Sequence, residues 1–191
     1  MRRLLPSVAL VAALIGVACG DPPDKEIQQA QGAIDAARAA GADQYASAEF
    51  TAAQDALKRA NDAVAQRDYR LALNHALDAR ERAQTAAKEA ADRKTTARSE
   101  AERALLDAMT ALNDAHTKLR AAESARAPAK MLAAARRVVT DGEDTVQKAR
   151  AAFDRGDFLA AKQTVTEMTE PLKATTHDLE TARPAGNRRH R

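Results

Sequence analysis

Small apolar residues recur every three or four positions along most of the chain after residue 25. Five segments carry this spacing, and alanine fills most of the repeated positions: 27–41, 50–64, 72–119, 132–153 and 158–182. Steps of three and four residues place a narrow apolar stripe on one face of an α-helix. The pattern therefore predicts five helices. The third, about 69–121, would reach roughly 80 Å if it is unbroken.

Capping residues indicate where these helices begin and end. A side-chain oxygen at the N-cap accepts a backbone N–H, and glycine just past a helix adopts positive φ without strain. The expected N-caps are Ser47, Asp68 and Asp157, with Gly41 at the end of the first helix and Pro128 in a first helical turn.

The sequence has two positions at which a predicted helix could be interrupted. The polar run 93–96 interrupts the stripe of the third helix and leaves open whether that helix is continuous. Pro171 lies inside the fifth helix and is expected to kink or split it, because proline removes a backbone donor and clashes with the preceding turn.

Two junctions between helices repeat the order aspartate, aromatic residue, two residues, alanine. They are 68–72 and 157–161. We interpret each as the turn of a helical hairpin, in which the aspartate caps the returning helix. All five aromatics lie at or near helix ends, where end plugs for the bundle are favoured over a ligand-binding cluster: Tyr45, Phe50, Tyr69, Phe153 and Phe158.

The predicted fold class is all-α. We expect an elongated antiparallel helical bundle or coiled coil, with two hairpin-like units, 25–95 and 96–182, that share the long central helix. Because the stripes are mostly alanine, each contact buries little area. A pocket large enough for a substrate is therefore not expected between such thin helices.

The N-terminus has the composition of an export signal. Arg2 and Arg3 precede an apolar stretch from Leu4 to Val17, which is shorter than the roughly 20 residues that a membrane-spanning helix needs. Small residues lead directly to Cys19, as in the lipobox of bacterial lipoproteins, although Gly16 stands where leucine is usual. We interpret 1–18 as a signal peptide and Cys19 as the acylated first residue of the mature chain. The alternative is ordinary signal cleavage that leaves a free thiol.

Cys19 is the single cysteine, so an intramolecular disulfide is excluded. Residues 19–24, with Pro22 and Pro23, would form a linker from the lipid to the first helix. In the known sorting rule, aspartate directly after the acylated cysteine retains a lipoprotein in the inner membrane. Here Gly20 follows Cys19, so the outer membrane is the expected location.

Charge is concentrated at the C-terminus. The chain has 30 basic residues, and 28 remain without the two leader arginines, against 27 acidic ones. The segment 183–191 carries no acid, and its four arginines could contact anionic lipid or glycan, or simply belong to a disordered basic tail: Arg183, Arg188, Arg189 and Arg191. Elsewhere the signs alternate, which argues against a nucleic-acid groove.

The sequence Tyr45-Ala46-Ser47-Ala48-Glu49, followed by Asp68-Tyr69 and by alanine at 72 and 76, resembles a bacterial envelope family known as domain of unknown function 4398. The resemblance covers roughly 25–105, and Ser47 stands where the family pattern has proline. It implies a short, alanine-rich helical lipoprotein of the envelope and implies no known activity.

No motif indicates catalysis or metal binding. The four histidines, at 75, 116, 177 and 190, lack partners at metal-ligand spacing, and no phosphate loop or nucleophile motif occurs. Asp141 to Asp144 lacks the alternating ligands of a calcium loop. Gly142 falls on the apolar stripe, so a close helix contact is the favoured interpretation.

The function expected from the sequence is a lipid-anchored structural or adaptor scaffold in the cell envelope, without enzymatic activity and without a cofactor. Its expected partners are the lipid bilayer, through Cys19, and envelope proteins. A self-assembling coiled-coil subunit is the alternative, because the alanine stripes could pair between chains as a homo-oligomer. A small-ligand carrier or an enzyme is the third hypothesis.

Overall fold

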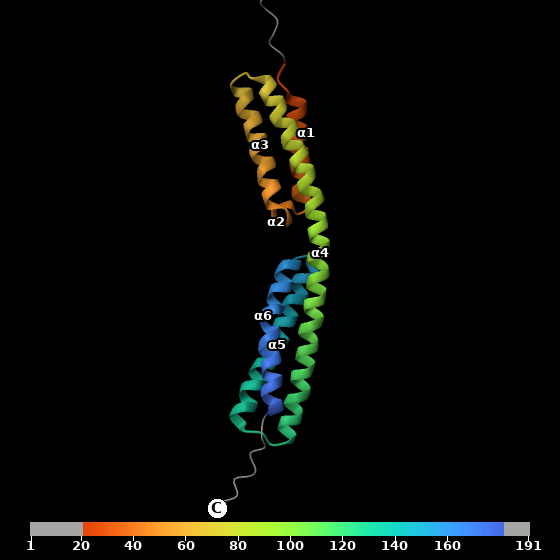
Figure 1. Ribbon diagram of the computed structural model, residues 1–191, viewed down its shortest axis with the longest axis vertical. Coiled ribbons are helices and arrows are strands. Elements are labelled where there is room, and N and C mark those ends of the chain that lie inside the picture. Colours follow the sequence, from red (N-terminus) through yellow and green to blue (C-terminus); the bar gives the residue numbers. More distant parts are fainter. Residues whose placement is uncertain (1–20, 182–191) are drawn as a thin grey trace, which may run out of the picture. The chain divides into compact units, whose positions relative to one another are not determined.

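The computed structural model describes residues 21–181 (Figure 1). Over this range the chain forms six α-helices and no strand, which confirms the all-α prediction. They are α1 (Asp24–Ala39), α2 (Ala42–Tyr45), α3 (Ser47–Ala65), α4 (Tyr69–Ser124), α5 (Ala129–Asp154) and α6 (Phe158–Thr181). The long third helix of the prediction is α4, and it continues through 93–96 without a break. None of the helices within 21–181 combines the length and the apolar content that crossing a bilayer requires.

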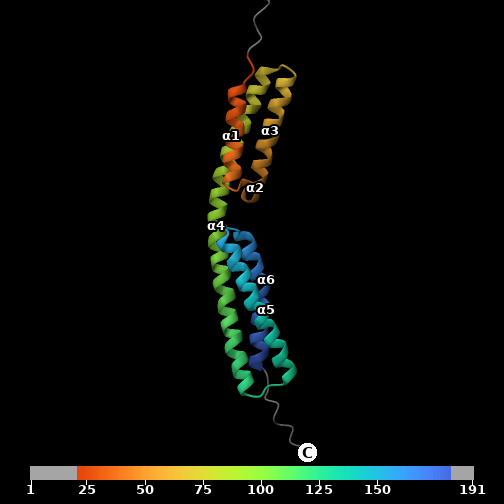
Figure 2. The same cartoon turned by 180° about the vertical axis from the view of Figure 1, so that it is seen from behind.

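The chain divides into two compact units within α4, the first ending at Arg93 and the second beginning at Lys94. In the first unit, α1 and α3 pack against the first part of α4. In the second, α5 and α6 pack against the rest of α4 (Figures 1 and 2). Each unit is a three-helix bundle in which successive long helices run antiparallel, so the predicted pair of hairpins sharing one central helix is confirmed.

Alanines with no solvent exposure fill the core of the first unit. Those on α1 and α3 are Ala30, Ala37, Ala53, Ala56 and Ala60, and those on α4 are Ala72, Ala76, Ala79, Ala83, Ala86 and Ala90. Among residues 21–181, no charged side chain is buried, although the hydroxyl of Tyr45 is enclosed. Because a methyl group is the largest side chain at these positions, the helix axes must lie close together for the core to exclude water.

The second unit mixes alanine with larger residues. Val165 and Leu172 of α6 have no exposed surface. The same is true of five alanines, which are Ala101, Ala108, Ala115, Ala149 and Ala161. Gly142 of α5 faces α4 and α6 with no room for a side chain, since a Cβ built there would lie 3.0 Å from Leu172 Cδ2 and 3.2 Å from Leu112 Cδ1. The prediction of a close packing contact at Gly142 is confirmed.

The two repeated junctions have the same backbone geometry. At the end of α3, Arg67 has φ of 60°, and the Asp68 N–H donates to the Ala63 carbonyl at 3.0 Å. At the end of α5, Gly156 has φ of 83°, and the Asp157 N–H donates to the Ala152 carbonyl, also at 3.0 Å. Both are Schellman motifs, in which a residue of positive φ lets the last carbonyls of a helix find donors.

Asp68 is the N-cap that the sequence predicts. Its Oδ1 accepts the Leu71 N–H at 3.0 Å, which satisfies a donor in the first turn of α4. A third Schellman motif, at Arg126 with φ of 56°, ends α4, and Gly41 with φ of 88° follows α1 as expected. A Cβ on Gly41 would approach the Tyr45 ring to 3.3 Å, so both the conformation and the space favour glycine.

The five aromatic residues lie near helix ends, and the three phenylalanines pack against one another or under arginines. The rings of Phe153 and Phe158 meet edge to face, with centroids 5.0 Å apart. The Arg38 guanidinium lies 5.5 Å from the centroid of Phe50, and Phe50 and Tyr45 are each 6% exposed. These contacts fit the interpretation of the aromatics as end plugs.

Two local predictions were wrong, and of the two outcomes expected at Pro171 the split does not occur. Ser47 is the first residue of α3 rather than its cap, because Ala46 takes the N-cap position without a side-chain hydrogen bond. Pro128 precedes α5 at the N-cap instead of lying in its first turn. Pro171 does not split α6, which runs from Phe158 to Thr181 with the proline on its exposed side. The four-residue α2 was not predicted, because so short an element has no periodicity.

Adding a side chain at one matched turn and removing one at the other should change the free energy of unfolding in opposite directions. Gly156→Ala should lower the free energy of unfolding by about 1 kcal/mol, because alanine is strained at positive φ and nothing else lies within 4 Å of the new Cβ. Arg67→Gly should raise it by up to about 1 kcal/mol, because it relieves the same strain. Urea unfolding followed by circular dichroism measures both, and a shift of the same sign in both variants would contradict this reading.

Candidate functional site

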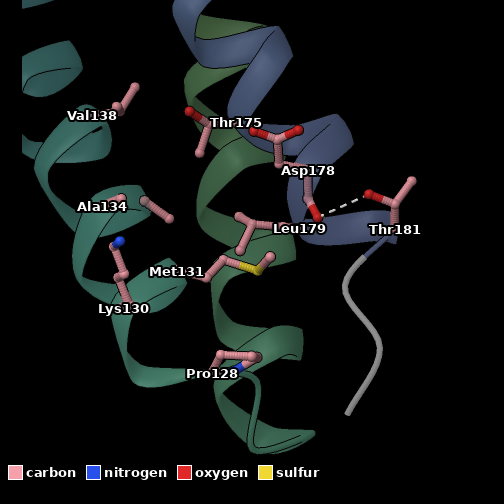
Figure 3. Close-up of a pocket in the computed structure, with 10 residues that line it drawn as sticks. Pro128, Lys130, Met131, Ala134, Val138, Thr175, Asp178, Leu179 and Thr181 are labelled. Carbon is pink, nitrogen blue, oxygen red and sulfur yellow. Dashed lines mark hydrogen bonds between the residues drawn. The ribbon is translucent and has the colours of Figure 1, made fainter. Parts of the chain in front are cut away.

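An apolar groove of about 610 Å³ lies in the second unit, between the start of α5 and the end of α6 (Figure 3). The groove is lined by ten residues, which are Pro128, Lys130, Met131, Ala134, Ala135, Val138, Thr175, Asp178, Leu179 and Thr181. Its volume lies within the range of small-molecule pockets, roughly 300–1,000 Å³. The expectation that alanine stripes leave no sizeable pocket is therefore wrong at this end of the unit.

Helical spacing places the lining side chains in two rows. Met131, Ala134 and Val138 follow one another at steps of three and four along α5, and Thr175 and Leu179 do so along α6. Figure 3 shows Met131 and Leu179 approaching each other across the floor of the groove. Both belong to the core cluster that continues toward α4, so the groove is an opening of the core to solvent.

Polar groups stand only at the edges of the groove. Lys130 and Asp178 bring one charge of each sign, and the Thr181 Oγ1 donates to the backbone carbonyl of Asp178 at 3.2 Å. Thr175 contributes a hydroxyl on the α6 side. This lining contains no nucleophile paired with a base and no set of metal-binding oxygens, so the groove is suited to hold apolar surface rather than to carry out a reaction.

A smaller pocket of about 350 Å³ lies on the other side of Leu179, beside the end of α4. Lys118 and Glu180 line it and form an ion pair with a 2.6 Å separation. The hydrogen bond from the Lys118 ammonium, together with its charge, lowers the pKa of the Glu180 carboxyl. On the first unit, the hydrogen bond with Asp62 at 2.9 Å raises the pKa of Lys58 in the same way. Both are exposed surface pairs.

The site residues predicted from the sequence lie outside the described part of the chain. These are Cys19 with its preceding signal segment, and the four tail arginines Arg183, Arg188, Arg189 and Arg191. Their predicted roles stay predictions. Within 21–181, what the structure adds is the apolar groove, which sequence reasoning missed.

The histidines within the described residues do not gather. His116 Nε2 lies 2.9 Å from Glu143 Oε1, which joins α4 to α5 at the surface. His75 is half-buried and His177 is exposed. Over residues 21–181, no group of three or more histidine, cysteine or carboxylate side chains is placed to hold a metal ion.

A dye whose fluorescence rises in apolar surroundings should detect the groove. We expect 1-anilinonaphthalene-8-sulfonate to fluoresce with the native protein, and Ala134→Glu to reduce the enhancement about three-fold or more, because it places a carboxylate among apolar groups. Ala133→Glu is the matched control, since Ala133 is also exposed on α5 but does not line the groove. Equal fluorescence with both variants would show that the dye binds elsewhere.

Comparison with known proteins bears on the first unit and the beginning of the second. Residues 25–104 match the model of a family described as a domain of unknown function (DUF4398). No curated protein and no solved structure matches the chain. The resemblance stated from the motifs at 45–49 and 68–76 is thereby confirmed. The match covers residues 25–104, which is less than half of the 191-residue chain, so the similarity holds for this segment.

Proposed function

We propose that this protein is a lipid-anchored component of the bacterial cell envelope and acts as a helical scaffold or adaptor. The observation that carries the proposal is the order of features at the N-terminus. A charged start, a short apolar stretch and small residues lead to the single cysteine, Cys19, and α1 begins only five positions later at Asp24. Such an arrangement tethers a folded unit close to a membrane surface.

The described surface supports a scaffold rather than a catalyst. Its charged side chains form exposed ion pairs, such as Lys162 with Glu100 at 2.8 Å and Arg136 with Glu123 at 2.7 Å. Pairs of this kind stabilise a fold only slightly, by about 0–1 kcal/mol. They leave a polar helical surface, which is available to partner proteins of the envelope. The expected partners are envelope proteins, through this surface, and the bilayer, through Cys19. The outer membrane is the favoured location because Gly20, and not aspartate, follows Cys19.

The apolar groove between α5 and α6 favours a second candidate function, carriage of a small apolar ligand. Its floor is apolar and its polar groups stand at the edge, which is the usual composition of a ligand pocket. A scaffold needs no such groove, whereas a carrier does. Binding of a natural apolar ligand that Ala134→Glu abolishes would favour the carrier.

Metabolic labelling with a fatty acid tests the anchor. Wild-type protein should incorporate label and fractionate with membranes, and Cys19→Ser should lose the label, because the thiol is the acylation site and the chain has no other cysteine. The control is a second variant, Ser47→Ala, which leaves Cys19 intact and should label as wild type does. Equal labelling of wild type and Cys19→Ser would overturn the lipoprotein proposal.

A further inference from the structure

Residues 65–71, the turn between α3 and α4 with the first residues of α4, form the tip of the first unit. The turn between α3 and α4 and the N-terminus of α1 lie at this same end (Figures 1 and 2). Arg80 Nη1 donates to Gln29 Oε1 at 2.8 Å, which fixes α1 alongside α4 with both helices running in the same direction. In this register Asp24 is level with His75. The turn therefore lies about 10 Å beyond the start of α1, at 1.5 Å per residue.

The length of chain before α1 limits how far this tip can be from the anchor. Four residues, 20–23, lie between Cys19 and Asp24, where α1 begins. At no more than about 3.6 Å per residue, the five steps from Cys19 to Asp24 span at most about 18 Å. Under the proposed function, on which this inference rests, a linker of this length allows the tip to reach the lipid headgroups.

The side chains on the tip are suited to such a surface. Residues 65–68 are all exposed, as is Arg70, and Leu71 is 40% exposed although it is a large apolar residue. Neither Arg67 nor Arg70 forms an ion pair with another residue of the described range. Tyr69 is half-buried between them. Two cations, a tyrosine and a leucine thus occupy five consecutive positions.

The acidic groups at this end are already engaged or set back. Asp68 accepts the Leu71 N–H as the cap of α4, and Asp62 pairs with Lys58 at 2.9 Å. Asp24 lies in the first turn of α1, where the helix dipole favours a negative charge, about 10 Å behind the tip in the register above. Within residues 65–71 the free charges are therefore the two guanidinium groups, and the exposed carboxylate of Asp21 lies on the segment that leads to Cys19.

We propose that this tip, residues 65–71, rests on the phospholipid headgroup layer. Arg67 and Arg70 bind headgroup phosphates, because a guanidinium presents paired donors that match phosphate oxygens. Leu71 and Tyr69 enter the boundary between headgroups and acyl chains, where amphipathic and apolar side chains are favoured. Every phospholipid carries a phosphate, so a zwitterionic bilayer is sufficient.

Tryptophan quenching in tethered protein tests the contact. The chain from Cys19 to Arg191 is coupled through its single thiol to a maleimide lipid in phosphatidylcholine vesicles that contain a brominated phospholipid. Since the sequence has no tryptophan, Gln66→Trp places one probe on the tip, and Ala39→Trp places the matched probe at the far end of α1. Both positions are exposed. We expect quenching at position 66 to exceed that at 39 about three-fold or more.

Adding Arg67→Glu and Arg70→Glu to the Gln66→Trp protein should reduce quenching to the level of the position-39 control. If that pair lowers the helix content by circular dichroism, Arg67→Gln with Arg70→Gln replaces it and should give the same loss. Equal quenching at 66 and 39, or quenching at 66 that survives removal of both arginines, would overturn the proposal. Because the tether is chemical, this outcome is independent of whether Cys19 is acylated in cells.

Discussion

Both units depend on how closely helix backbones can approach where the buried side chain is only a methyl group or a hydrogen. In the first unit the fully buried positions of α4 are alanines at steps of three and four, and in the second Gly142 is in contact with two leucines. Burying a methyl group removes little apolar area, so each contact contributes little. The sum is favourable only when the helices are near enough to exclude water along their whole length, which makes the fit between them the condition for the fold.

This constraint also explains where a binding surface can form. A core of alanines has no room for a polar network, and no charged side chain within 21–181 is buried. Where Met131, Val138 and Leu179 stand in place of alanine at the end of the second unit, α5 and α6 leave a groove. In the first unit, the turn after α3 leaves the side chains of Arg67, Arg70 and Leu71 exposed. The two candidate contact surfaces thus arise where the close packing ends.

Much of the fold could be predicted from the sequence, because the helical period is long and regular. The stripe, the hairpin turns at Asp68 and Asp157, and the contact at Gly142 all follow from local spacing. Continuity of α4 through 93–96 could not be predicted, since a polar run permits both a break and a solvated helix. Continuity of α6 through Pro171 could not be predicted either. The proline lies on the exposed side of the helix, and the helix continues past it. The groove depends on the spacing between the start of α5 and the end of α6, which are far apart in the sequence, so a local pattern cannot predict it.

The central claim, that tight spacing at alanine holds the bundle together, is tested most directly by enlarging one of these residues. Ala83 is fully buried in the first unit, and Ala36 is exposed on α1 of the same unit. Leucine and alanine are both strong helix formers, so changing one to the other tests packing. Urea unfolding followed by tyrosine fluorescence reports this unit, because Tyr45 and Tyr69 both lie in it. The account predicts that Ala83→Leu lowers the free energy of unfolding by about 1–3 kcal/mol, whereas Ala36→Leu changes it by less than about 0.5 kcal/mol. An unchanged or increased stability for Ala83→Leu would contradict it.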